Sequence, residues 1–320
     1  MESRRDWSDA EVGLTLRSRW VEWRLCLPPS FGVVPLKDSV VTLYGRNRRV
    51  TEDPIASSGE HDVPKLDTSV PQTARIWNYL LGGKDNFAVD RAVGDQIMQA
   101  LPHFAEHARL SRRYLVRAVR YLAGEAGIRQ FLDVGTGLPT ADNTHEVAQK
   151  VAPDARIVYV DNDPLVLVHA RALLTTSPEG ATEYIDADLY DPAAILREAS
   201  QLLDFGKPVA LMLMGILGHV ESDDEAKSIV GRLMAALPSG SYLAMYDGSD
   251  MDPDIVEAAR IWNLSANPKY HLRSPKRIEE LFGGLELVEP GVVPVTRWRP
   301  DAEAASAPAI AQYCAVGLKP

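Results

Sequence analysis

A regular alternation of apolar strand-like runs with helical segments in the second part of the chain constrains its fold more than any other feature. Each run is a near-continuous series of apolar residues, as expected for a strand buried on both faces. Alternating strand and helix units form a parallel sheet with helices on both faces. The sequence therefore predicts an α/β fold with strands over residues 130–135, 156–161, 182–188, 208–214 and 241–247.

The segments between these strands carry helix-start signals. Asp163 is the expected N-cap of one helix, with Pro164 at its first position, and Ser222 with Glu225 forms a capping-box pattern. No long helix separates the last two strand-like runs, at 285–288 and 311–318, so we expect a final antiparallel hairpin at one edge. The sequence predicts helices near 141–151, 163–174, 191–203, 222–237, 252–264 and 275–282.

Three further helices are expected before the first strand, over 72–81, 85–101 and 106–127. The first ends at Gly82-Gly83, a C-terminal stop signal, and Asp85 is the expected N-cap of the second.

Two glycines followed by Lys84, Asp85 and Asn86 resemble a hinge with polar tips. We interpret this segment as a lid over a cleft, with Tyr79, Lys84 and Asn86 facing the ligand. The alternative is an ordinary helix–helix turn.

Residues 1–66 differ from the rest of the chain. They hold ten basic and ten acidic residues, contain "LPPS" and "ASSGEHD", and show no sustained hydrophobic period. We interpret them as a poorly ordered extension with one short helix near 8–24, although a wrongly assigned start codon is an alternative. The expected organisation is this extension over 1–66, a helical lid segment over 67–127 and a ligand-binding core over 128–320.

Composition excludes several kinds of partner. The formal net charge of −10 argues against general binding to nucleic acid or an anionic membrane. Cys26 and Cys314 form neither a disulfide framework nor part of a zinc motif, so no metal is expected and a cytoplasmic location fits best. No apolar run reaches the roughly 18 residues of a membrane helix, and the N-terminus has no apolar signal core.

The stretch "FLDVGTGLPT" places a glycine turn, Gly135-Thr136-Gly137, at the end of the first strand, where parallel sheets bind ligands. A lone G-x-G is a weak signal that dinucleotide sites share. Asp133, two residues before the turn, favours a cationic ligand over a pyrophosphate. S-adenosylmethionine (SAM) carries both a sulfonium and an α-ammonium.

Acids also follow the next two strands. Asp161, beside Asn162, is placed to accept ribose hydroxyls, as it would be in a dinucleotide site. Asp188 is placed to accept the adenine amino group while Leu189 offers a backbone N–H. The alternative for each acid is that it only caps the following helix.

These stretches resemble the class I SAM-dependent methyltransferases. More specifically, the chain is similar to a bacterial, largely actinobacterial S-adenosyl methyltransferase family first catalogued as a domain of unknown function. The likeness covers residues 67–320 and depends mainly on "ARIWNYLLGGKDNFAVDRA" (74–92) and "FLDVGTGLPTADNTHEVAQ" (131–149). Further matching stretches are "VYVDNDPLVLVHARALL", "DADLYDP" and "SPKRIEELFGGLELVEPGVVPVTRWRP".

The resemblance implies SAM as the cofactor. It also implies a Rossmann-like, mostly parallel seven-stranded sheet with an antiparallel C-terminal strand and an N-terminal helical lid. Pro139 replaces the third glycine of the common G-x-G-x-G motif, so the cofactor carboxylate is expected to be held differently. The resemblance gives no methyl acceptor.

The acceptor side is less constrained. Met214 and Gly215, after the fourth strand, are expected to border the methionine moiety, and His219 and Asp247 are candidate general bases. A structural role for either is the alternative. An arginine stripe on the helix over 106–127 is either a solvated face or a site for an acidic acceptor: Arg109, Arg112, Arg113, Arg117 and Arg120.

We therefore predict SAM-dependent methyl transfer to an unidentified small molecule. Two alternatives are an NAD(P)-dependent oxidoreductase and a non-catalytic SAM-binding regulatory protein.

Overall fold

The computed structural model describes residues 66–173 and 176–320. All of them belong to the second of two units into which the chain divides, Asp62–Pro320. The predicted extension over 1–66, with its helix near 8–24, lies outside the described residues except for Leu66.

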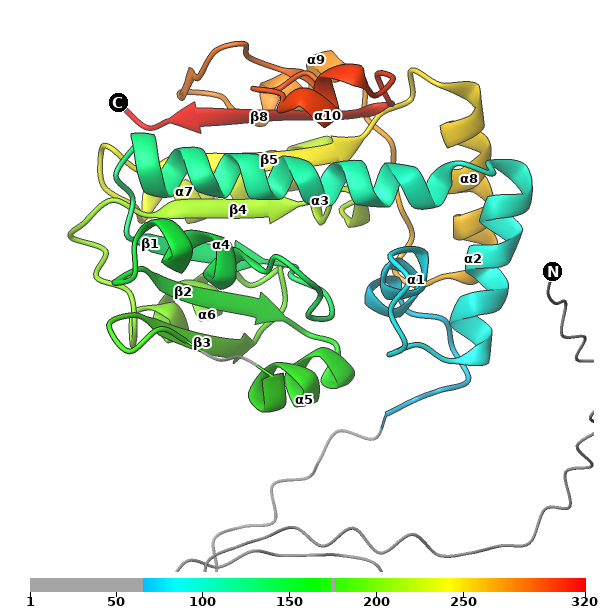
Figure 1. Cartoon of the computed structure of the whole chain (residues 1–320), viewed down its shortest axis with the longest axis horizontal. Helices are drawn as coiled ribbons and strands as arrows, with labels where there is room; N and C mark the ends of the chain where they lie inside the picture. Colours follow the sequence, from blue (N-terminus) through cyan, green and yellow to red (C-terminus); the bar gives the residue numbers. More distant parts are fainter. Residues whose placement is uncertain (1–65, 174–175) are drawn as a thin grey trace, which may run out of the picture. The chain divides into compact units, whose positions relative to one another are not determined.

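A single mixed sheet organises these residues (Figure 1), in the order β3-β2-β1-β4-β5-β8-β6, with β7 also paired to β8. The pairs among β1 to β5 are parallel, and β8 is antiparallel to β5, β6 and β7. The predicted α/β class, mostly parallel sheet and antiparallel C-terminal strand are confirmed. The prediction of seven strands missed β7, which makes this an eight-stranded sheet in the described residues. The strands are β1 (Gln130–Val134), β2 (Arg156–Asp161), β3 (Ala181–Asp186), β4 (Ala210–Met214), β5 (Tyr242–Gly248), β6 (Glu286–Leu287), β7 (Val293–Pro294) and β8 (Gln312–Leu318).

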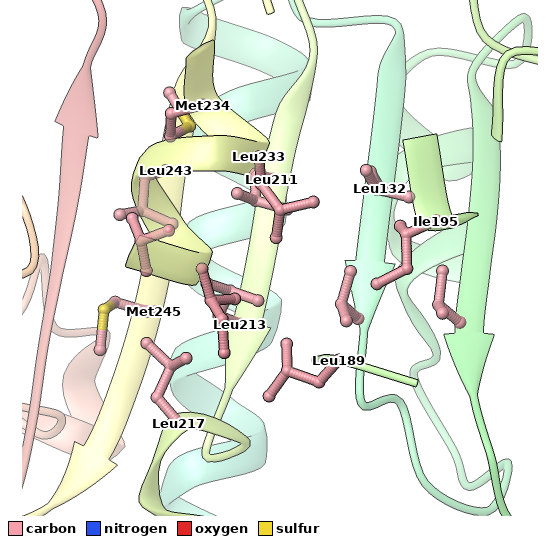
Figure 2. Close-up of a cluster of buried hydrophobic side chains, with 14 of the residues drawn as sticks. Leu132, Leu189, Ile195, Leu211, Leu213, Leu217, Leu233, Met234, Leu243 and Met245 are labelled. Carbon is pink, nitrogen blue, oxygen red and sulfur yellow. The ribbon is translucent and has the colours of Figure 1, made fainter. Parts of the chain in front are cut away.

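Both faces of the sheet are buried. On β4, Leu211 and Leu213 face one hydrophobic cluster, whereas Ala210 and Met212 face another, so the period of two explains why this strand is apolar throughout. Figure 2 shows the first cluster, in which side chains of β4 and β5 meet Leu233 and Met234 of α7. The helices are α1 (Thr73–Leu80), α2 (Ala88–Ala100), α3 (Phe104–Arg120), α4 (Thr144–Val151), α5 (Pro164–Leu173), α6 (Pro192–Ala199), α7 (Asp223–Ala235), α8 (Pro253–Ser265), α9 (Pro275–Glu280) and α10 (Ala302–Ser306), with a π-helical turn η1 (Tyr121–Glu125) and a 3-10 turn η2 (Leu217–His219).

A third hydrophobic cluster joins α1, α2 and α8, with Ile76, Ile97 and Trp262 among its buried members. Figure 1 shows α1 and α8 beyond the arrowheads of β2 and β4, where the parallel strands end. By contrast, α3 covers one face of the sheet, and its Tyr114 donates a hydrogen bond to the carbonyl of Ala315 on β8 (2.8 Å). Of the helices within residues 67–127, therefore, α1 and α2 lie beyond the strand ends, whereas α3 packs on a face of the sheet.

The prediction that Asp85 caps the second helix is wrong, because α2 begins three residues later at Ala88. The N-terminus of α2 is stabilised by Asp90, a buried residue in the first turn of the same helix. The carboxylate of Asp90 accepts hydrogen bonds from the backbone N–H groups of Phe87 (2.8 Å) and Gln72 (2.9 Å). One acid therefore satisfies the starts of both α1 and α2. The predicted cap at Asp163 is confirmed, since Oδ1 accepts the N–H of Leu165 (2.8 Å). Helix α10, which Asp301 caps, is not predicted from the sequence.

Within residues 66–173 and 176–320, no helix has both the length and the apolar character needed to cross a bilayer.

Candidate active site

Two adjoining hollows open at the ends of the parallel strands, where the order reverses between β1 and β4. The α1–α8 hollow, of about 200 Å³, is lined by those two helices and by the turn after β1. The β2–β3 hollow, of about 460 Å³, is lined by the ends of β2 and β3. Gly135, Asp161 and His219 line both, so the two form one continuous site of a size usual for small ligands.

Glycines allow the backbone to line this site closely. Gly135 (φ 74°), Gly137 (φ 66°) and Gly215 (φ 80°) lie in the left-handed region, which L side chains rarely adopt. A Cβ on Gly135 would collide with the side chain of Ile216, and one on Gly215 would lie 3.0 Å from the ring of Tyr246. The turns after β1 and β4 therefore need glycine for both conformation and space.

Asp133 is a buried carboxylate at the end of β1, and only 4% of it is exposed. Its Oδ2 accepts a hydrogen bond from the hydroxyl of Thr144 at the start of α4 (2.6 Å), and Oδ1 has no hydrogen-bond partner among the described residues. Burial raises the pKa of Asp133 to about 6, although Thr144 and Arg112 oppose the rise. A cation placed beside this carboxylate would relieve the cost of burying its charge.

Asp161, at the end of β2, holds the glycine turn. Its Oδ2 accepts the N–H of Gly137 (2.8 Å), and its Oδ1 accepts those of Asn162 (2.9 Å) and Asp163 (3.0 Å). Burial raises the pKa of Asp161, and these backbone hydrogen bonds lower it. A carboxylate accepts about four hydrogen bonds, so roughly one acceptor position remains for a ligand.

Asp163 adds a second acid at this place. Oδ1, which caps α5, also pairs with the guanidinium of Arg75 on α1 (3.3 Å), and both side chains are more than nine-tenths buried. Its Oδ2 has no hydrogen-bond partner among the described residues, although Asp163 lines both hollows. The sequence predicts only a capping role for Asp163, because no local pattern reveals a pair 88 residues apart.

The other predicted cofactor residues line the site as follows. Thr136 and Met214 line the α1–α8 hollow, and the hydroxyl of Thr136 shares a hydrogen bond with that of Tyr184 (2.6 Å). The exposed Asp188 lines the β2–β3 hollow together with Leu189 and accepts the N–H of Tyr190 (2.9 Å). Asn162 lines both hollows.

The predicted lid residues do not line either hollow. The hydroxyl of Tyr79 donates to Asp95 of α2 (2.6 Å), Lys84 is exposed, and the amide of Asn86 donates to Asn78 (2.9 Å) and to the carbonyl of Gly83 (3.0 Å). Asn86 therefore shapes the turn between α1 and α2.

The face of α1 that does line the α1–α8 hollow follows helical spacing and was missed: Thr73, Ala74, Trp77, Asn78 and Leu81. That spacing was visible in the sequence and would have separated this face from Tyr79.

His219 ends the 3-10 turn after β4 and lines both hollows. Its Nδ1 lies 2.8 Å from the carbonyl oxygen of Lys269, which can only accept, so Nδ1 carries the hydrogen and Nε2 is the acceptor of the neutral ring. Burial lowers the pKa of His219 to about 4. At neutral pH this histidine is uncharged and can receive a proton on Nε2.

Asp247 does not line either hollow. It has no exposed surface, accepts hydrogen bonds from the Tyr270 hydroxyl and the Gly248 N–H (3.0 Å), and pairs with Arg273 (3.5 Å). Burial raises the pKa of Asp247 to about 6. Arg273 also donates to the carbonyl of Leu217 (2.7 Å), at the start of the turn that carries His219.

The arginine stripe of α3 is largely engaged within the chain. Arg112 donates to the carbonyls of Ala141 (3.2 Å) and Asp142 (3.0 Å), and the buried Arg117 donates to those of Trp298 (3.1 Å) and Val295. Arg109 pairs with Glu106 (2.9 Å), and Arg113 pairs with Asp301 (3.2 Å) and Glu303, while Arg120 is exposed. Of the five, only Arg112 lines a hollow, so the stripe is not an open site for an acidic acceptor.

The profile of the S-adenosyl methyltransferase family matches residues 59–320. The chain belongs to this family. It is 48% identical to a DUF574 family protein from Streptomyces avermitilis MA-4680, with a TM-score of 0.77 over 80% of this chain and 100% of that one. It is also 45% identical to a proposed methyltransferase from Thermobifida fusca YX, with a TM-score of 0.74 over 82% of this chain and 99% of the other. No curated protein matches the chain.

Family membership confirms the predicted cofactor and enzyme class: a SAM-dependent methyltransferase with the Rossmann-like fold of its class. Neither an NAD(P)-dependent oxidoreductase nor a non-catalytic SAM-binding protein is supported by these likenesses.

Proposed function

We propose that SAM binds to the strand-end wall of the site, which consists of Asp133, the turn Gly135-Thr136-Gly137 and the acids that follow β2 and β3. The methyl group of SAM then passes to a small molecule in the α1–α8 hollow. The observation that carries the assignment is Asp133, a buried carboxylate with one unpartnered oxygen beside a glycine turn. A buried acid requires a positive partner, and both the sulfonium and the α-ammonium of SAM supply one. The donor set thus fits this cofactor better than an anionic dinucleotide.

In this assignment the methionine part of SAM contacts Asp133 and the turn residues Gly135, Thr136 and Gly137, with Met214 and Gly215 on the opposite side. The adenosine part occupies the β2–β3 hollow. Asp161, Asn162 and the free oxygen of Asp163 receive ribose hydroxyls, while Asp188 and Leu189 border the adenine.

Bound SAM supplies a methyl group already activated on sulfur, so the protein mainly aligns an acceptor with it and excludes water. His219 is proposed as the group that takes the acceptor proton, because its Nε2 is the acceptor nitrogen of a neutral ring at the site. Asp247 is proposed to act as a positioning residue, because Arg273 ties it to the turn that carries His219.

The small size of the hollows supports a small-molecule acceptor. We also propose a bacterial, cytoplasmic enzyme without nucleic-acid substrates. The two similar structures come from bacteria, Cys314 is a buried free thiol, and the net charge of −10 disfavours polyanions.

Thermal unfolding with equal concentrations of S-adenosylhomocysteine (SAH), SAM, NAD and NADP tests the cofactor assignment. A ligand at about 100 times its Kd adds about 2.7 kcal/mol to the free energy of unfolding, which raises Tm by several degrees. We expect a shift with SAH and SAM alone. A shift with the dinucleotides alone would overturn the proposal.

A further inference from the structure

The α1–α8 hollow has an aromatic wall that SAM binding leaves unexplained. Trp77 of α1, Phe104 of α3, Trp262 of α8 and Tyr270 contribute rings to it, and Leu81, Ile255 and Leu272 add aliphatic surface. Trp77 and Phe104 meet edge to face with centroids 6.3 Å apart, and His219 meets Tyr270 in the same way at 5.0 Å. Such a wall favours flat, apolar ligands, because aromatic rings pack edge to face or offset against one another.

The distribution of charge along the hollow separates two halves. Among the described residues that line it, the acids Asp133, Asp161 and Asp163 and the base Arg112 all belong to β1, to the end of β2 or to α3. The parts contributed by α1, α8 and residues 268–272 contain no Asp, Glu, Lys or Arg. Because an unpaired charge is costly to bury, this half disfavours a phosphorylated, carboxylated or ammonium-bearing acceptor.

One polar side chain beside this aromatic wall, that of His219, can take a proton. The ring of His219 lies against Tyr270 and 6.3 Å from that of Trp262, and the carbonyl of Lys269 fixes its Nδ1 as the donor. Its Nε2 is therefore the nitrogen available to a hydroxyl. Burial lowers the pKa of His219 to about 4, so it serves as a base only for an acidic hydroxyl. A phenol, with a pKa of about 10, meets this condition far better than an aliphatic alcohol.

We propose that the α1–α8 hollow binds a neutral, flat aromatic compound and that its phenolic hydroxyl is the methyl acceptor, with His219 receiving the proton. The inference rests on the proposed function and adds the class of acceptor. The phenolic oxygen forms the new bond to the methyl carbon, and its proton passes to Nε2 of His219. Sulfur keeps the electron pair of the bond that breaks, which leaves SAH, and the imidazolium then releases its proton to water.

Equilibrium dialysis against the full-length protein saturated with SAH tests this inference without turnover. The probes are 2-naphthol, which is flat, neutral and phenolic, 2-naphthoate, which is flat and charged, and trans-2-decalol, which is a saturated alcohol of similar size. We expect 2-naphthol to bind at least tenfold more tightly than either of the others. Equal or tighter binding of 2-naphthoate or the decalol would overturn the inference.

Two variants of α8 locate the binding. Ala259 is half-buried and lines the hollow, so Ala259→Trp should fill it and weaken 2-naphthol binding at least tenfold while SAH binding stays unchanged. The matched control is Val256→Trp, at a position of the same helix that is 45% exposed and does not line the hollow, and it should change neither affinity. Unchanged 2-naphthol binding in Ala259→Trp would contradict the proposal.

If Ala259→Trp loses SAH as well, Trp77→Ala decides, because it removes a ring from the wall without filling the hollow. It should weaken 2-naphthol at least fivefold and leave SAH binding intact, and an unchanged affinity for 2-naphthol would overturn the proposal. Failure of the wild-type protein to bind SAH would instead overturn the proposed function, and this inference with it.

Discussion

The two walls of the site are built by different means. The strand-end wall consists of backbone turns and acids, because parallel strands end there and left-handed glycines bring the main chain close to the ligand. The helical wall consists of large apolar side chains from α1 and α8, which also form their own small core with α2. The first wall is made by the sheet and suits a polar, cationic cofactor. The second is made by helices packed beyond the sheet and suits an uncharged ligand.

The difference shows how the fold divides two tasks. The glycine turn depends on a few residues within ten positions of each other, and Asp161 holds it to the next strand. The helical wall depends on contacts between segments far apart in the chain. Variants of the first wall should therefore change cofactor affinity, whereas variants of the second should change acceptor affinity.

Arg273→Met should lower the free energy of unfolding more than any other variant, because it removes the centre of a buried polar network next to the site. It leaves the buried Asp247 without its ion pair and removes donors from the carbonyls of Leu217 and Val220. Breaking a buried ion pair costs about 3–5 kcal/mol, which urea unfolding can measure. Arg277→Met is the matched control, because Arg277 pairs with the same Asp223 as Arg273 (3.0 Å) but its side chain is 62% exposed. The control should lower the free energy of unfolding by less than about 1 kcal/mol. Equal losses in the two variants would refute a structural role for the buried network.

Asp133→Asn should weaken SAH binding by about 1.5–3 kcal/mol, the usual range for a hydrogen bond to a charged group. The variant keeps the shape of the side chain and removes the charge that we propose to face the ammonium of SAH. Isothermal titration calorimetry measures the change in affinity for SAH. The control is Asp188→Asn, at an exposed acid of the β2–β3 hollow, which should lose less binding free energy. A larger loss in Asp188→Asn would show that the adenine end dominates binding.

The affinity for SAH should rise as the pH increases from 5 to 7. Burial raises the pKa of Asp133 to about 6 in the free protein, so the acid is protonated below that pH. The α-ammonium of SAH favours the ionised form of Asp133 and lowers this pKa, so binding below pH 6 requires loss of a proton. We expect up to about a tenfold gain per pH unit below 6, flattening above it.

Adenosine, which lacks the ammonium, should show no such dependence, and neither should SAH with Asp133→Asn. A steep dependence that persists in this variant would assign the titration to another group.

Lys84→Ala should have the smallest effect. Lys84 is exposed and lines neither hollow, so both the free energy of unfolding and the affinity for SAH should change by less than about 0.5 kcal/mol. A tenfold loss of SAH affinity would restore the interpretation of the Gly82-Gly83 segment as a lid that contacts the ligand.

The place of the glycine turn at the end of β1 could be predicted from the sequence for a physical reason. Strand, turn and helix signals lie close together in the chain, so the apolar run before Asp133 and the two glycines after it define both the local structure and its place at the sheet edge. The same reasoning from neighbouring residues wrongly predicted Asp85 as the cap of α2. The side chain that caps this helix is that of Asp90, which also accepts a hydrogen bond from the start of α1.

The helical wall could not be predicted from neighbouring residues. Whether Trp77 or Tyr79 faces the site depends on how α1 packs against α2, where Tyr79 donates to Asp95, and on where the distant α8 closes the hollow. The pair of Arg75 with Asp163 and the burial of Asp247 against Arg273 are likewise long-range contacts. Helical spacing alone would have indicated that Trp77, Asn78 and Leu81 share a face, but not that this face lines the site.

A crystal structure of the chain with SAH tests the division between the two walls most directly. We expect the ammonium of SAH to contact the carboxylate of Asp133, the ribose to lie beside Asp161 and Asp163, and the sulfur to face the aromatic wall near His219. An adenine ring stacked among Trp77, Phe104 and Trp262, with no ligand atom near Asp133, would contradict it.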